Sequence, residues 1–136
     1  MLEEQLKALL AEFGLPDEHA VTFGHPKMKM KWVLPLPGVS VYSFEQFQPF
    51  FIYFDSEGIS FFPLNEKNYA MGRSFIAWGD IKEFRFKKGL VMEDEIRVQG
   101  DGFRIEMKIP KAKAMNPWVK ENNAYLSEKN YFYRQE

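Results

Sequence analysis

The sequence predicts a mainly β fold (α+β): a curled antiparallel sheet of about seven strands, closed by one C-terminal helix and preceded by an additional N-terminal helix. Two observations carry this prediction. Between Ile81 and Ile109, three short runs alternate apolar and polar residues, with the period of two that is typical of strands with one buried face. An Asn-Pro pair at 116–117 then gives a helix start directly after the last run.

Residues 1–14 are expected to form an amphipathic helix. Its apolar residues recur at helical spacing, and they are Leu2, Leu6, Leu9, Leu10 and Phe13. Gly14, followed by Leu15-Pro16, gives a stop signal. The leucine stripe is expected to pack on the domain itself or, alternatively, on a second copy of the chain.

The sheet is expected within residues 20–110, and its most regular charge pattern is the run Lys27–Trp32. Read as a strand, this run places three lysines on one face and three large apolar residues on the other: Lys27, Lys29 and Lys31 against Met28, Met30 and Trp32. Residues 35–48 receive no assignment, because two prolines and a glycine interrupt regular pairing and the pattern behind them fits a strand and a helix equally.

Two apolar runs, 50–54 and 59–64, flank Asp55-Ser-Glu-Gly58 and predict a β-hairpin. Gly58 is expected to close its turn with a positive φ, which most other residues adopt only with strain. After a polar loop, Arg73–Trp78 predicts another strand that leads into the meander.

The three runs of the meander are expected to divide their residues between two faces. The inner face takes the apolar positions Phe84, Phe86, Ile96, Val98, Phe103, Ile105, Met107 and Ile109. The outer face takes the charged positions Glu83, Arg85, Lys87, Glu95, Arg97, Arg104, Glu106 and Lys108. Opposite charges on neighbouring strands contribute a few tenths of a kcal/mol per pair, so this outer face indicates strand register and solvation rather than function.

The C-terminal helix is expected over residues 116–132, with Asn116 as N-cap and Pro117 at the first helical position. Its apolar side is broad and consists of Trp118, Val119, Asn122, Tyr125, Leu126 and Phe132. We therefore expect the helix to plug an open end of the sheet.

Length and composition favour a single domain over residues 1–136, because 46% apolar content with 14 Phe is enough to fill one core. The absence of cysteine excludes a disulfide framework and a cysteine nucleophile, and it agrees with a cytoplasmic location. No run approaches the roughly 20 apolar residues of a transmembrane helix. A formal net charge of -1 gives no long-range attraction to nucleic acid, so no nucleic-acid partner is expected.

No pattern in the sequence indicates catalysis, a metal or a cofactor, and we expect none of the three. The residues nearest to a metal set match no named ligand spacing; they are Asp17, Glu18, His19 and His25. The glycine and proline that flank His25 favour an exposed loop. The acidic run Glu93–Glu95 is expected to be solvated, since neighbouring side chains of a strand point in opposite directions.

Four segments together carry a family resemblance: the strand pair Ile52–Phe61, the step Trp78-Gly-Asp-Ile81, the turn Lys87-Lys-Gly-Leu90 and the hairpin Ile96–Ile109. In this pattern, residues 49–131 resemble the bacterial pleckstrin-homology-like (PH-like) domains of the YokE and GRAM type. Asp55-Ser-Glu-Gly58 departs from the Thr-Asn-Arg step usual in that family, and the first 48 residues match none of it. The resemblance implies a PH-like β-barrel, capped by a helix, that acts as a binding or scaffolding module.

The expected function is that of a non-enzymatic binding or oligomerisation module acting through protein–protein contacts, because 17% aromatic residues exceed what one core hides. Self-association through a sheet edge or through the N-terminal helix is included. The alternative is weak binding of anionic-lipid or phosphoinositide head groups by a basic surface of Lys27, Lys29, Lys31, Lys87 and Lys88. Lysines alternating along an edge strand also discourage aggregation, which explains the same pattern without a ligand. A small hydrolase or ligand-enclosing barrel is the third reading.

Overall fold

The computed structural model describes residues 2–27, 30–32, 42–44, 48–89, 93–110 and 117–133. Its strands are β1 Val21–Pro26, β2 Met30–Trp32, β3 Tyr42–Phe44, β4 Phe50–Phe54, β5 Gly58–Pro63, β6 Ser74–Ala77, β7 Glu83–Lys87, β8 Glu93–Gly100 and β9 Phe103–Pro110. Its helices are α1 Leu2–Phe13 and α2 Pro117–Glu128, with 3-10 turns at Glu18–Ala20, Trp78–Asp80 and Asn130–Phe132. The prediction of a mainly β fold with a helix toward each end is confirmed.

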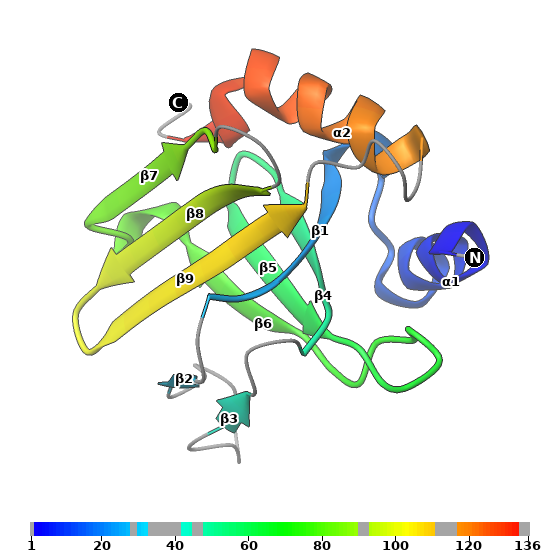
Figure 1. The fold of residues 1–136 in the computed structure, drawn as a ribbon, viewed down its shortest axis with the longest axis horizontal. Helices are drawn as coiled ribbons and strands as arrows, with labels where there is room; N and C mark the ends of the chain where they lie inside the picture. Colours follow the sequence, from blue (N-terminus) through cyan, green and yellow to red (C-terminus); the bar gives the residue numbers. More distant parts are fainter. Residues whose placement is uncertain are drawn as a thin grey trace.

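Seven strands form one antiparallel sheet in the order β6-β5-β4-β1-β9-β8-β7, and β2 and β3 form a separate pair (Figure 1). The sheet is curled, and α2 lies across one of its ends while α1 lies at its side (Figure 1). A curled sheet of seven strands with a C-terminal capping helix is the architecture that the PH-like resemblance implies. One hydrophobic core joins the sheet to both helices, through Leu6 and Leu9 of α1 and Leu126 of α2.

Strand β1 joins the two halves of the sheet. Val21–Gly24 pair with β4, and the next two residues, His25 and Pro26, pair with β9. A Cβ atom at Gly24 would lie 2.7 Å from the carbonyl oxygen of Lys108, so glycine lets the two backbones approach each other here. The prediction of an exposed loop around His25 is therefore wrong. This segment is a central strand, and Pro26 is its last residue.

The meander of β7, β8 and β9 is confirmed, with long antiparallel pairings between consecutive strands. The inner positions of β8 and β9 are buried, namely Ile96, Val98, Ile105, Met107 and Ile109. Phe84, Phe86 and Phe103 pack against the core from partly buried positions. The outer face carries the predicted mixture of acidic and basic side chains, which form ion pairs with one another.

The β4–β5 hairpin is confirmed, but its turn closes differently from the prediction. The Asp55 carboxylate accepts hydrogen bonds from the backbone N–H groups of Glu57 (2.8 Å) and Gly58 (3.0 Å), which is an Asx-type turn. Gly58 does not have a positive φ. Glycine is required there by space, because a Cβ atom would lie 2.2 Å from the carbonyl oxygen of Ile76 on β6.

Helix α2 is fixed to the start of β1 by polar contacts. Asn122, which is buried, donates 2.8 Å hydrogen bonds from Nδ2 to the carbonyl oxygens of Glu18 and Val21. The Tyr125 hydroxyl donates to the Asp17 carboxylate at 2.8 Å, and this hydrogen bond raises the pKa of the tyrosine. Asn116, the predicted N-cap, lies outside the described residues.

The C-terminal helix ends earlier than predicted. Regular α-helix stops at Glu128, and the turn that follows has positive φ at Asn130, Tyr131 and Phe132 (53°, 56° and 59°). This left-handed turn directs Tyr131 into the core, where its ring stacks on Phe86 at 4.9 Å. Burial raises the pKa of the Tyr131 phenol well above its ordinary range.

Helix α1 packs on the chain's own sheet, one of the two arrangements predicted for its leucine stripe. Leu6 and Leu9 are buried, and the Phe13 ring lies 4.8 Å from the ring of Phe62 on β5. Of the unassigned stretch 35–48, the described part is β3 together with Gln48, and the rest lies outside the described residues.

Candidate functional site

Three of the five predicted basic residues surround one hollow of about 400 Å³ on the outer face of the meander. They are Lys27, Lys87 and Lys88, and the hollow is completed by Gly89, Glu93, Glu95 and Lys108. Lys27 follows β1, whereas Lys87 and Lys88 lie at the end of β7. The fold thus brings together residues that are far apart in the sequence.

The strand predicted over Lys27–Trp32 is not found as one element. Lys27 remains beside β9, because its backbone N–H donates to the Glu106 carbonyl oxygen at 3.0 Å. Strand β2 begins at Met30 and pairs with β3, so Lys31 belongs to the separate two-stranded sheet. Lys29 lies outside the described residues. The structure therefore places the backbone of Lys31 in another sheet than the strands around Lys27.

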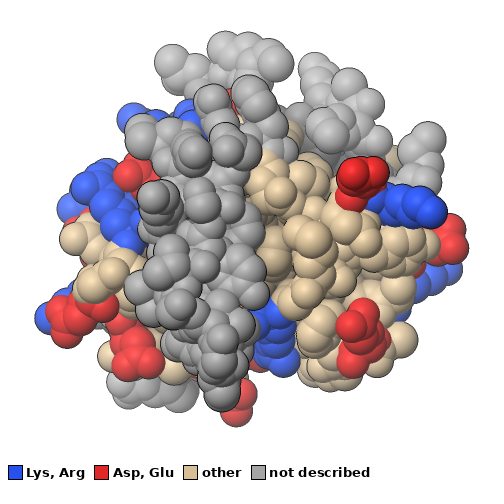
Figure 2. Space-filling model, turned by 90° about the horizontal axis from the view of Figure 1, so that it is seen from below, with Lys and Arg blue, Asp and Glu red and all other residues tan. Residues whose placement is uncertain are grey.

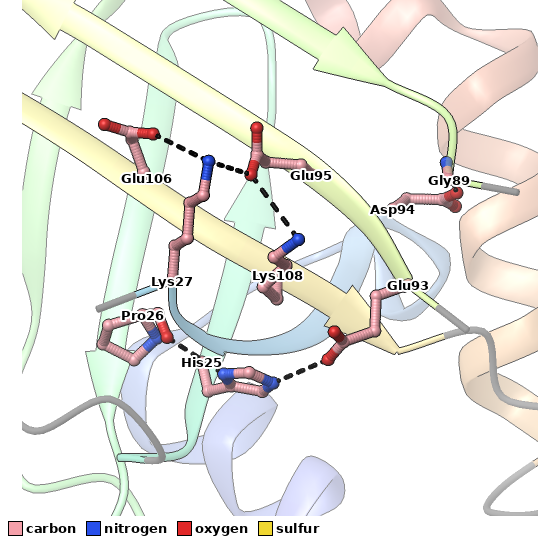
Figure 3. A network of polar contacts seen from close by, with 9 residues as sticks. All are labelled: His25, Pro26, Lys27, Gly89, Glu93, Asp94, Glu95, Glu106 and Lys108. Atoms are coloured by element: carbon pink, nitrogen blue, oxygen red, sulfur yellow. Dashed lines mark hydrogen bonds and ion pairs between the residues drawn. The ribbon is translucent and has the colours of Figure 1, made fainter. Parts of the chain in front are cut away.

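Two lysines of this hollow are held by carboxylates (Figure 3). The Lys27 ammonium lies 3.0 Å from Glu95 and 3.7 Å from Glu106, and Lys108 lies 3.7 Å from the same Glu95 oxygen. Burial by itself would raise the pKa of Glu95, but the hydrogen bond and charge of Lys27, with the charge of Lys108, lower it. The pKa of Lys27 is raised by the same hydrogen bond. Much of the positive charge in this hollow is thus balanced within the fold.

The two histidines lie in different surroundings. His19 is exposed on the first 3-10 turn, whereas His25 is partly buried in β1. His25 Nε2 lies 3.0 Å from a Glu93 carboxylate oxygen and Nδ1 lies 3.0 Å from the Pro26 carbonyl oxygen (Figure 3). Glu93 is thereby drawn into the polar network of the meander. Across the described parts of the chain, His, Asp and Glu side chains do not gather into a group that could hold a metal.

A second, larger hollow was missed by the sequence analysis. It has a volume of about 740 Å³ and lies between the edge strand β6 and the tip of the β8–β9 hairpin. Its lining is mostly apolar or small, with charged residues at one side: Phe75, Ile76, Ala77, Gly79, Phe103 and Ile105, with Asp80, Lys82 and Asp101, and with Gly102 in the hairpin turn. Lys82 and Asp101 form an ion pair at 2.7 Å.

The residues of this apolar hollow gave a weak sequence signal. The sequence predicts strands at Phe75 and at Phe103. The burial of these side chains, however, depends on how β6 packs against the tip of the β8–β9 hairpin. The 3-10 turn Trp78–Asp80 connects β6 to the meander at this point, where the sequence predicted a simple turn. The local sequence signal near this hollow was the pair Gly100 and Gly102, which marks the turn of the hairpin.

Comparisons with protein-family models, with curated proteins and with solved structures find no significant match to this chain. In the part of the chain that the structure describes, neither helix has the length and apolar composition needed to cross a bilayer.

Proposed function

We propose that this chain is a non-enzymatic binding module of PH-like type that takes a protein partner along strand β6 and in the apolar hollow beside it. The observation that carries the proposal is the position of this hollow next to the outermost strand of the sheet. The seven-stranded curl with its capping helix supports the PH-like assignment, because it has the architecture that the resemblance implies.

An edge strand offers two kinds of contact to a partner. Within the described segments, β6 pairs with β5 alone, through Phe61↔Ser74 to Gly58↔Ala77. The backbone groups on its other side can pair with an extended segment, while pockets beside the strand receive alternate side chains. Phe75 and Phe103, both half-buried, supply apolar contact surface of the kind that anchors interfaces.

Figure 2 views the molecule from below, the side on which β2 and β3 lie in Figure 1, and shows an area of uncharged residues with acidic and basic residues around it. Met71, in the loop before β6, is an exposed large apolar residue at 58%.

Site-specific photo-crosslinking tests the proposal. A photoreactive phenylalanine analogue is placed at position 75, and a control carries it at position 120, which is exposed on α2. We expect one discrete adduct from position 75 and none from position 120. Unlabelled wild-type protein is expected to compete for that adduct. Unlabelled Phe75→Lys, which puts a charge into the hollow, is expected not to compete. Equal, diffuse crosslinking from both positions would refute the proposal.

Sedimentation equilibrium then distinguishes the two kinds of partner. If the partner strand comes from a second copy, the apparent mass rises with concentration and Phe75→Lys returns it to that of the monomer. If the mass stays monomeric, mass spectrometry of the adduct identifies a different protein. A monomeric profile would contradict self-association. The proposal of a binding module would then be decided by the crosslinking result.

Weak attachment to anionic lipid is the second candidate, because the fold gathers Lys27, Lys87 and Lys88 around one hollow. Basic residues near an anionic surface contribute on the order of 1 kcal/mol each. We expect K87E/K88E to abolish sedimentation with phosphatidylserine vesicles at low salt. The matched control K7E/K120E changes two exposed lysines on the helices and is expected to leave sedimentation intact. Equal loss in both variants, or no sedimentation of the wild type, would exclude this candidate.

A further inference from the structure

One pair of like charges stands directly opposed in the strand registers that the structure describes. Arg85 on β7 faces Arg97 on β8. Elsewhere on this face opposite charges meet, as in Lys87↔Glu95 and Glu95↔Lys108. Arg97 also has a carboxylate residue, Glu106, opposite it on its other side, in β9. Like charges in directly opposed positions destabilise a sheet, so the arginine pair is not explained by strand pairing.

The carboxylates near the two arginines do not satisfy all of their hydrogen-bond donors. Glu83 is shared, since one of its oxygens lies 3.3 Å from Arg85 Nε and 3.6 Å from Arg97 Nη1. The Nε atom of Arg97 is buried and has no hydrogen-bond partner among the residues that the structure describes. Glu106, opposite Arg97 on β9, has one carboxylate oxygen 3.0 Å from Arg104 and the other 3.7 Å from Lys27. Glu95 is held by Lys27 and Lys108. The arginine pair therefore has more donor capacity than its surroundings use.

A hollow of about 470 Å³ lies over this pair, lined by Arg85, Phe86, Lys87, Glu95 and Arg97. Three of these five residues are cationic. The whole outer face carries a basic excess although the chain has a formal net charge of -1. Its basic residues are Lys27, Arg85, Lys87, Lys88, Arg97, Arg104 and Lys108, and its acidic residues are Glu83, Glu93, Glu95 and Glu106.

We propose that the hollow between Arg85 and Arg97 binds a phosphate monoester. Two guanidinium groups on neighbouring strands present planar forks of donors, and a phosphate monoester offers nearly two negative charges and three terminal oxygens to receive them. The Lys87 ammonium adds a third positive charge at the rim. A carboxylate ligand carries one charge and two oxygens, so it leaves part of this donor set unused.

The same chemistry is presented by a small soluble phosphate ester and by a phosphoinositide head group. Both require the arginine pair, and they differ only in what the phosphate is attached to. The site lies on the outer face of the meander and shares no residue with the apolar hollow at β6. Phosphate binding and partner binding at β6 therefore succeed or fail independently of each other.

Titration with inorganic phosphate at low salt, followed by the Nε–H signals of the arginine side chains in NMR spectra, tests the proposal. We expect saturable shifts of the Arg97 and Arg85 signals, and none of comparable size with chloride at equal ionic strength. Arg85→Gln is expected to weaken binding about tenfold. Its side chain is 65% exposed, so the fold should be retained. Arg97→Lys keeps the charge but loses the fork, and is expected to weaken binding several-fold.

Arg104→Gln is the matched control, because Arg104 lies on the same face and is 53% exposed but does not line the hollow. It is expected to change phosphate affinity by no more than about twofold, the effect of a distant screened charge. Equal weakening by Arg85→Gln and Arg104→Gln would reduce the effect to general surface charge and overturn the site. Non-saturable shifts in the wild type would overturn it as well.

Two further probes identify the source of the phosphate. Glycerol phosphate tests the soluble ester, and phosphatidylcholine vesicles with or without phosphatidylinositol monophosphate test the lipid head group. Binding of either probe that is lost in Arg85→Gln supports the proposal and assigns the source. If neither probe binds in a manner sensitive to Arg85, the proposal is wrong.

Discussion

The β4–β5 hairpin and the β7–β9 meander are parts of one sheet, but they bury different numbers of faces. Every residue of β4 and β5 is buried. In β8 and β9, buried residues alternate with partly exposed ones. The hairpin therefore reads as a continuous apolar run and the meander as an alternation, which is the distinction expected between strands covered on two faces and strands covered on one.

Terminal segments of the chain account for the second covered face of the hairpin. Phe51 and Phe62 are opposite each other on this face, and they contact Trp118 of α2 and Phe13 of α1. On the inner face, Phe54 contacts Phe84 of the meander and Tyr131. Both helices thus contribute an aromatic side chain to the hairpin, while the outer face of the meander keeps the charged surface on which the lysine and arginine hollows lie.

The largest effect is expected from truncating an aromatic side chain on either face of the hairpin. Phe54→Ala and Phe62→Ala are each expected to lower the free energy of unfolding by about 3–5 kcal/mol, because both side chains are fully buried. Urea unfolding followed by circular dichroism measures the loss. A cost for Phe62→Ala of about 1 kcal/mol or less, typical of a surface position, would show that α1 does not cover the hairpin.

Gly58→Ala tests the close approach of β5 and β6 and is expected to cost about 1–3 kcal/mol, because the new methyl group would meet the backbone of Ile76. Gly72→Ala is the control. A Cβ atom there has no neighbour within 4 Å, so the expected change is near zero or slightly stabilising. Equal thermal midpoints for the two variants would mean that β6 is displaced easily, and the edge strand proposed for partner binding would lose its fixed position.

The elements that the sequence predicted correctly are those with local signals. The meander was indicated by alternation, the β4–β5 hairpin by an apolar run on each side of Asp55-Ser-Glu-Gly58, and the terminal helices by spacing and caps. The same local rules failed at β1, because Gly24 and Pro26 are turn-forming residues in most contexts. Here the glycine is required by the crossing of two backbones, which is a property of the assembled sheet.

The candidate sites show the same limit more clearly. The pattern of lysines was visible, but the carboxylate that holds Lys27 comes from β8, and only the strand order places it there. The Arg85–Arg97 opposition depends on the register of β7 against β8, which a shift of one residue would remove. The burial of Tyr131 was not predicted, because the left-handed turn that directs its ring inward contains no glycine, the usual sequence signal of such a turn.

Glu95→Gln tests how much the meander depends on its ion pairs. Because the folded-state pKa of Glu95 lies below its ordinary value near 4.5, the ionised carboxylate favours the folded state, and this contribution is present above that value. It is lost as the pH falls through the lowered pKa. We therefore expect the stability gap between wild type and Glu95→Gln to be greatest near neutral pH and to close in acid.

Urea midpoints measured from about pH 7 down to about pH 3 follow this gap. Glu66→Gln, at an exposed position in the loop between β5 and β6, removes the same charge without an ion pair of the meander and is expected to leave the midpoint unchanged. A gap for Glu95→Gln that does not vary with pH would contradict the ion-pair explanation, since the effect would then come from packing of the side chain.

The smallest effect is expected on the outer face of the meander away from both hollows. Arg104→Ala should change the free energy of unfolding by about 0.5 kcal/mol or less, because its ion pair with Glu106 (3.0 Å) is half exposed and screened. Ile105→Ala, the next residue and on the inner face, should cost about 2–5 kcal/mol. A large difference between these adjacent positions is what one covered face requires. Similar losses at both positions would mean that the outer face is covered by another part of the chain, and a face covered in that way could not admit the phosphate group proposed for the arginine pair.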